Sequence, residues 1–118
     1  MIADRTAPDT GTTLVPVTRT RMARYASAVQ DFNPVHFDDE FARAAGLPTV
    51  IVQGPFTVAL VLDALRSEAG LPAAGKVSAR LKAPVFPGEE LTVVRGDAGA
   101  ELRKADGTVA VVVSFGDS

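Results

Sequence analysis

The feature that most constrains the fold is a change in hydrophobic period near residue 76. Residues 56–69 are apolar on nearly every helical face, with Asp63 as the first charge, which is typical of a buried helix. The dipeptide Gly54-Pro55 precedes this segment, and proline at the first helical position marks a helix start. From Lys76 onward, apolar and polar residues alternate as in β-strands. The pattern predicts an α+β fold in which an antiparallel sheet wraps around a long central buried helix.

Turn and cap signals predict the other elements. Upstream of the central helix we expect a leader at residues 1–11, an edge strand at 12–17 and two helices at 18–29 and 38–45. We expect residues 12–118 to form a single domain. Thr18 or Thr20 would cap the first of these helices, and Asp38 or Asp39 the second. Downstream we expect an antiparallel meander of four consecutive strands, at residues 76–83, 90–95, 100–104 and 108–115.

A sheet that wraps around one helix leaves an edge strand and an outer side uncovered. A chain of 118 residues has few further helices to cover them. A second copy of the chain is the economical cover, so we expect a homodimer.

Composition excludes several classes of function. Twelve basic against 14 acidic residues leave a net charge of −2, so we expect no nucleic-acid and no membrane partner. The chain has no cysteine and one histidine, which excludes disulfides, thiolate metal sites and paired-histidine metal motifs. We therefore expect no metal and no cofactor. The polar amino terminus has no secretory apolar stretch, and a cytoplasmic location follows by default.

One acid and the only histidine lie close together in the sequence. Asp31 and His36 are five positions apart, with the turn dipeptide Asn33-Pro34 between them. Such a turn can direct both side chains to one water, where one group takes a proton and the other orients or donates. Alternatively, Asp31 and Asn33 cap the turn through backbone hydrogen bonds and His36 is simply packed or exposed. Spacing alone favours this structural interpretation.

The start of the central helix is a second candidate site. The backbone N–H groups of a helix N-terminus are unpaired and suit an oxygen that becomes negative during a reaction. Gly54 would let a substrate approach the backbone closely, and Gln53 lies beside it. Alternatively, Gly54-Pro55 only begins the helix, and without further context the sequence favours this interpretation too.

Residues 25–42 resemble the hydratase-2 motif of the MaoC-like (R)-specific enoyl-CoA hydratase and dehydratase family. The motif's DxNPxH core corresponds to Asp31, Asn33, Pro34 and His36. The resemblance continues at residues 41–46, 52–54 and 77–89, and so covers roughly residues 14 to 95 in order. It implies a hot-dog fold, in which an antiparallel sheet wraps a central helix, usually in a dimer.

The resemblance also implies a reaction, the reversible hydration of trans-2-enoyl thioesters to (R)-3-hydroxyacyl thioesters. Asp31 and His36 would hold and activate the water, the N–H of Gly54 would bind the thioester oxygen, and Asn33 would brace the loop. The acyl carrier would be coenzyme A or an acyl carrier protein. For the acyl pocket we expect side chains near the turn and on the central helix: Phe32, Val58 and Leu62.

Two residues depart from the family pattern. Glycine is usual where Gln30 stands, and histidine where Gln53 stands; Gln53 keeps an amide donor beside the oxyanion site.

Two alternative functions stay open. Hot-dog domains include acyl-CoA thioesterases, for which Asp63 would be the only carboxylate in the central helix. The chain could also be a subunit of a heteromeric dehydratase.

Overall fold

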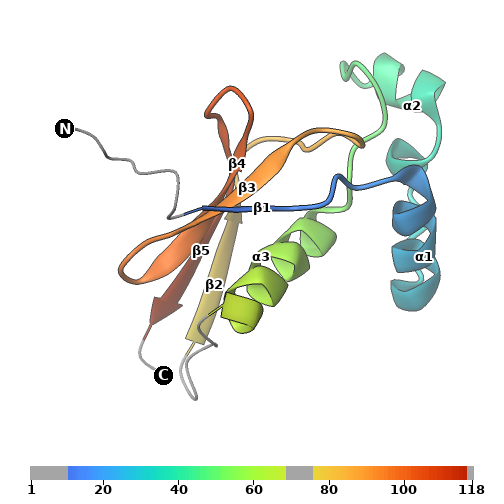
Figure 1. Ribbon diagram of the computed structural model, residues 1–118. Coiled ribbons are helices and arrows are strands. Elements are labelled where there is room, and N and C mark those ends of the chain that lie inside the picture. Colours follow the sequence, from blue (N-terminus) through green and yellow to red (C-terminus); the bar gives the residue numbers. More distant parts are fainter. Residues whose placement is uncertain (1–10, 69–75, 117–118) are drawn as a thin grey trace.

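The computed structural model describes residues 11–68 and 76–116 (Figure 1). The order along the chain is a short strand, two helices joined through a 3₁₀ turn, the central helix and four strands. Their bounds are β1 Gly11–Thr13, α1 Arg19–Val29, the 3₁₀ turn Pro34–His36, α2 Asp39–Ala44, α3 Gly54–Glu68, β2 Lys76–Leu81, β3 Leu91–Arg95, β4 Gly99–Lys104 and β5 Val109–Gly116. The leader expected at residues 1–11 lies almost wholly outside the described residues.

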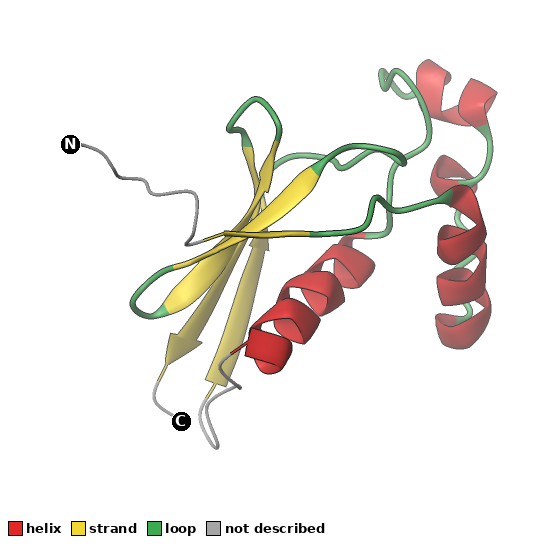
Figure 2. Ribbon diagram, in the orientation of Figure 1, coloured by secondary structure: helices red, strands yellow, loops and turns green. Residues whose placement is uncertain are grey.

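The strands form one antiparallel sheet with α3 against one face, so the α+β prediction is confirmed (Figure 2). The strand order is β1-β3-β4-β5-β2. The prediction of four consecutive neighbours was therefore wrong: β3, β4 and β5 form a meander, but β2 pairs with β5 at the far edge. The segment between β2 and β3 contains Pro84, Pro87 and Gly88, which do not suit a strand interior. It leads from the edge strand β2 past β5 and β4 to β3.

The core lies between α3 and the middle of the sheet. Val61 and Leu65 of α3 are buried, as are the alternate residues of β3, β4 and β5 that face the helix. Four further apolar residues of α3 are partly buried and pack against this core: Phe56, Val58, Leu60 and Leu62. The helix is thus the central one, but within one chain only the face toward the sheet is buried, although the apolar sequence predicts burial on nearly every face.

Strand β2 is exposed along its whole length. Its row of apolar side chains, Val77, Ala79 and Leu81, alternates as predicted, but Val77 and Leu81 keep 49% and 56% of their surface exposed. The reason is geometric: α3 packs on β3, β4 and β5, and β2 pairs with a neighbour on one side only. In the part of the chain that the structure describes, no strand covers its outer edge, and its apolar face is largely exposed.

Helix α1 begins and ends as local rules predict. Thr18 caps it, its hydroxyl oxygen accepting a hydrogen bond from the N–H of Arg21 at 3.2 Å. The helix ends at Gln30, which has φ 61° and ψ 39° in the left-handed region. Glycine adopts this conformation most readily, which explains why glycine suits this position.

We expect a β-branched residue at position 30 to destabilise the protein. Gln30→Val should lower the free energy of unfolding by about 1–2 kcal/mol, because the left-handed conformation is most strained for such residues. Gln30→Gly should keep or slightly raise it. Urea unfolding of both variants measures the difference, and equal stability of the Val and Gly variants would contradict this account.

Candidate active site

Asp31 and His36 face each other across the turn that follows α1. The His36 Nε2 atom lies 3.8 Å from Oδ2 of Asp31. The imidazole is nearly buried, with 9% of its side chain exposed, whereas the carboxylate is 42% exposed. The gap is longer than a direct hydrogen bond. The pair therefore presents a base and a carboxylate on the accessible side of the turn, where one water beside the two groups would contact both.

The turn itself is built by Asp31 and Asn33. Asp31 Oδ1 accepts a hydrogen bond from the N–H of Asn33 at 3.3 Å, and Asn33 Oδ1 accepts one from the N–H of Val35 at 3.0 Å. Pro34 then occupies the first position of the 3₁₀ turn that ends at His36. The two interpretations of this segment are thus compatible, because Asp31 uses one oxygen to shape the turn and directs the other toward His36.

A second hydrogen bond sets the orientation of the imidazole. The carbonyl oxygen of Ile51 lies 2.7 Å from Nδ1 of His36. A carbonyl only accepts, so Nδ1 carries the hydrogen, and in the neutral ring Nε2 is left as a lone-pair acceptor facing Asp31. The N–H of Ile51 donates to the carbonyl of Val35 at 3.2 Å. The turn is therefore tied twice to the segment that leads into α3.

Gly54 begins α3 three residues after Ile51. Within the described residues its backbone N–H has no hydrogen-bond partner, as expected at a helix N-terminus. Leu81 of β2 covers the α-carbon: a methyl group at position 54 would lie 2.5 Å from Leu81 Cδ1. Position 54 therefore needs a residue without a side chain while Leu81 stays in this place.

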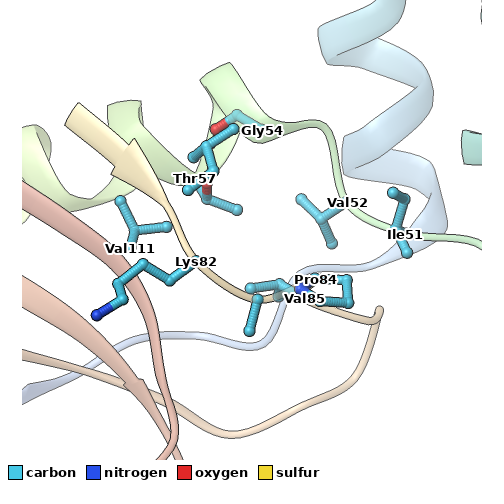
Figure 3. A pocket seen from close by; sticks show the side chains of 10 residues that line it. Ile51, Val52, Gly54, Thr57, Lys82, Pro84, Val85 and Val111 are labelled. Carbon is cyan, nitrogen blue, oxygen red and sulfur yellow. The ribbon is translucent and has the colours of Figure 1, made fainter.

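Beside Gly54 lies an apolar cavity of about 310 Å³ (Figure 3). It opens between the first turn of α3, the end of β2 and the segment that follows β2. The lining residues are Ile51, Val52, Gly54, Thr57, Leu81, Lys82, Ala83, Pro84, Val85 and Val111. Its size and apolar walls suit an acyl chain.

Three residues that the sequence suggested for the acyl pocket do not line this cavity. Phe32 lies in the turn beside Asp31 and is 59% exposed. Val58 and Leu62 are partly buried against the core of α3. Within one chain, these three residues and Gly54 thus do not line the same cavity.

Gln53 is directed toward α1 rather than into the cavity. Its side chain is fully buried, and Nε2 donates to the carbonyl of Met22 at 2.9 Å. Oε1 has no partner among the described residues. The ring of Tyr25 stacks on Phe56 at 4.8 Å, a second contact between α1 and the start of α3. The amide donor expected beside Gly54 therefore serves to hold two helices together.

Because this amide is buried, we expect a charge there to be costly. Gln53→Glu should lower the free energy of unfolding near neutral pH by about 3–5 kcal/mol, since the carboxylate would meet the Met22 carbonyl without a donor. Gln53→Leu removes the polar group without adding charge and should cost less than half as much. Thermal unfolding compares them, and equal losses would show that shape rather than charge decides.

Asp39 was expected only as a possible helix cap, but the structure gives it a larger role. Asp38 is the cap of α2, and Asp39 instead joins three segments. Its Oδ1 accepts hydrogen bonds from the Thr49 hydroxyl at 2.6 Å and the Val50 N–H at 3.2 Å, and Arg19 Nη2 lies 3.1 Å away. These partners are 10 to 20 residues distant, so no local sequence signal marks them.

We expect Asp39 to make stability depend on acid pH. Hydrogen bonds from Thr49 and then Arg19 lower the pKa of Asp39 from 3.8 to about 2. A lowered pKa in the folded state gives stability that is fully present above pH 3.8 and is lost as the pH falls toward 2. The difference in unfolding free energy between the native protein and Asp39→Asn should shrink over this range. Thr49→Val should weaken that dependence, and a constant difference down to pH 2 would contradict the assignment.

Among residues 11–68 and 76–116, no group of three or more His, Cys, Asp or Glu side chains is placed to hold a metal ion. No helix in these ranges is long and apolar enough to cross a membrane.

Comparison with known proteins defines first the class of fold and then the family. The (R)-hydratase of Aeromonas caviae involved in PHA biosynthesis superposes with a TM-score of 0.74 at 25% identity, over 89% of this chain and 90% of that one. The structure of HtdX from Mycobacterium tuberculosis gives a TM-score of 0.73 at 35% identity, over 91% of this chain and 47% of that one. These similarities confirm a hot-dog fold.

The profile of the MaoC like domain family matches residues 5–115. In sequence, 3-hydroxyacyl-thioester dehydratase X of Mycobacterium tuberculosis is 40% identical over 88 residues, which cover 73% of this chain and 31% of that protein. The (R)-specific enoyl-CoA hydratase of Aeromonas caviae is 35% identical over 75 residues, or 60% of this chain and 54% of that one. The chain belongs to the MaoC-like domain family, and its 88 matched residues cover less than a third of that dehydratase.

Proposed function

We propose that this domain catalyses the reversible addition of water to trans-2-enoyl thioesters, giving (R)-3-hydroxyacyl thioesters. The observation that carries the proposal is the Asp31–His36 pair, whose Oδ2 and Nε2 atoms face each other at 3.8 Å. The apolar cavity beside the Gly54 N–H and the enoyl-CoA hydratase and dehydratase names of similar proteins support it.

In the hydration direction, the water would contact both Asp31 and His36 from the accessible side of the turn. Nε2 of His36 takes a proton from the water while the water oxygen forms a bond to C3 of the enoyl group. The π electrons of the double bond move toward the thioester, and the Gly54 N–H stabilises the enolate oxygen that forms. C2 then takes a proton from the pair, so that one water has been added. Dehydration follows the same steps in reverse.

The hydrogen bond to Ile51 makes His36 suitable for this role. It holds the hydrogen on Nδ1 and the lone pair on Nε2, and it fixes the plane of the ring. When Nε2 gains a proton, the nearby Asp31 carboxylate stabilises the positive charge. Asn33 has a positioning role, since its contacts hold Asp31 in the turn.

We also propose that the domain works as a dimer, as a homodimer or with a related chain. The exposed edge and apolar face of β2 support this, because an uncovered edge strand pairs readily with a second sheet.

The geometry gives no support to a thioesterase that uses Asp63. Its carboxylate is 65% exposed and forms an ion pair with Arg66 at 2.6 Å. It lies nine residues beyond Gly54, which places it about 13 Å along the helix axis. A carboxylate there is remote from the thioester oxygen site.

Replacement of either reacting group should abolish most of the activity. Asp31→Asn and His36→Ala should each lower kcat by at least about 100-fold, the usual effect of a positioned acid or base. Loss of the conjugated enoyl absorbance of a short enoyl-CoA measures hydration, and released thiol would reveal hydrolysis instead.

Asp97→Asn is the matched control, since it removes an exposed carboxylate from the turn between β3 and β4. It should keep native turnover, and circular dichroism should show all three variants folded. Native turnover by either the Asp31 or the His36 variant would remove the proposed function.

A further inference from the structure

Lys82 connects the apolar cavity to a second hollow on the outside of the sheet. Its side chain lines the cavity with Gly54, and it also lines a hollow of about 270 Å³ with Ser78, Arg80 and Ser114. Figure 3 shows the lysine extending along the cavity wall, with its nitrogen on the side remote from Gly54. The ammonium group therefore marks a path from the proposed reaction site to the outer face.

The outer hollow belongs to a row of polar and basic side chains on β2. Alternate residues of a strand share one face, so Lys76, Ser78 and Arg80 lie together, and Lys82 continues the row. Ser78 is paired with Ser114 of β5 across the strands, and Arg80 with Val112. We call these residues the β2 basic row: Lys76, Ser78, Arg80, Lys82 and Ser114.

The three cations of this row have no acidic partner among the described residues. On the same face, the acid nearest in register is Glu101, which is paired with Val112 in the neighbouring strand. Its carboxylate already binds Arg103 at 2.7 Å. A chain with a net charge of −2 thus carries a local excess of positive charge beside the proposed substrate site.

Phosphate groups fit this row better than other anions. A guanidinium, ammonium groups and two hydroxyls supply several donors to one group of oxygens. A strand rises about 3.3 Å per residue, so Ser78 lies about 13 Å along β2 from Lys82, which lines the cavity. The row therefore leads away from the cavity over a length comparable to that of an extended pantetheine arm.

We propose that the β2 basic row binds the phosphate groups of coenzyme A while the acyl thioester occupies the cavity beside Gly54. The inference rests on the proposed function and specifies the carrier of its substrate. Pairing of the β2 edge with a second domain uses backbone groups and leaves the outer-face side chains free for this contact. Three cations on a negatively charged domain form a small site, which suits a nucleotide rather than a long polyanion.

The test compares one acyl group on two carriers. For Arg80→Glu, the KM for crotonyl-CoA should rise by about tenfold or more, because one charge-assisted contact is replaced by repulsion. The KM and kcat for crotonyl-pantetheine, which has no phosphate, should stay native. Increasing salt should raise the KM for crotonyl-CoA only. Arg43→Glu on α2 changes the charge equally away from the row and should change neither substrate.

The affinity for free coenzyme A, measured by calorimetry, supplies a readout that needs no turnover. Arg80→Glu should weaken it by the same factor and Arg43→Glu should not. Equal binding by both variants would overturn the proposal, even if hydration of both thioesters proves the function. If Arg80→Glu loses activity only toward a crotonyl acyl carrier protein and not toward crotonyl-CoA, the row binds an acidic protein instead. That result would also overturn the proposal. If neither thioester is hydrated but only Arg80→Glu weakens coenzyme A binding, the proposed function fails and the phosphate site stands.

Discussion

The hydrogen bond from His36 to the carbonyl of Ile51 is the contact on which the site depends. It joins the turn after α1 to the segment that enters α3, and these two segments carry all the groups proposed for catalysis. It also fixes which imidazole nitrogen carries hydrogen. One backbone carbonyl therefore sets both the chemistry of the base and its position relative to the Gly54 N–H.

The surrounding contacts reinforce this connection from two sides. Gln53 links the start of α3 to the Met22 carbonyl within α1, immediately upstream of the turn. Asp39 links α2, immediately downstream of the turn, to Thr49 and Val50. The turn is thus held at its entrance, at His36 and at its exit, which provides the rigid support that a catalytic pair needs.

Local sequence signals predicted much of this arrangement. Three of these signals influence only the backbone within one helical turn: Thr18, Asn33-Pro34 and Gly54-Pro55. The start of α1, the 3₁₀ turn and the start of α3 therefore follow from short-range rules. The turn that brings Asp31 and His36 together is also local. Their spacing alone favoured a structural role, and the resemblance to the hydratase-2 motif is what indicated catalysis.

The errors concern contacts between distant segments. Nothing in the alternation of β2 states whether its partner is β3 or β5, because both pairings keep the same residues on the same face. Gln53 was expected beside the oxyanion site because of its neighbour Gly54, but α1 offers a carbonyl acceptor 31 residues away. The exposure of β2 follows from where α3 packs, which no strand pattern records.

The central claim is that Asp31, His36 and Gly54 act on one substrate molecule. The most direct measurement is a crystal structure with a bound (R)-3-hydroxyacyl thioester. The account predicts the 3-hydroxyl group within hydrogen-bond distance of both Nε2 of His36 and the Asp31 carboxylate, and the thioester oxygen on the N–H of Gly54 of either subunit. A hydroxyl group bound elsewhere, with the thioester oxygen away from Gly54, would contradict it.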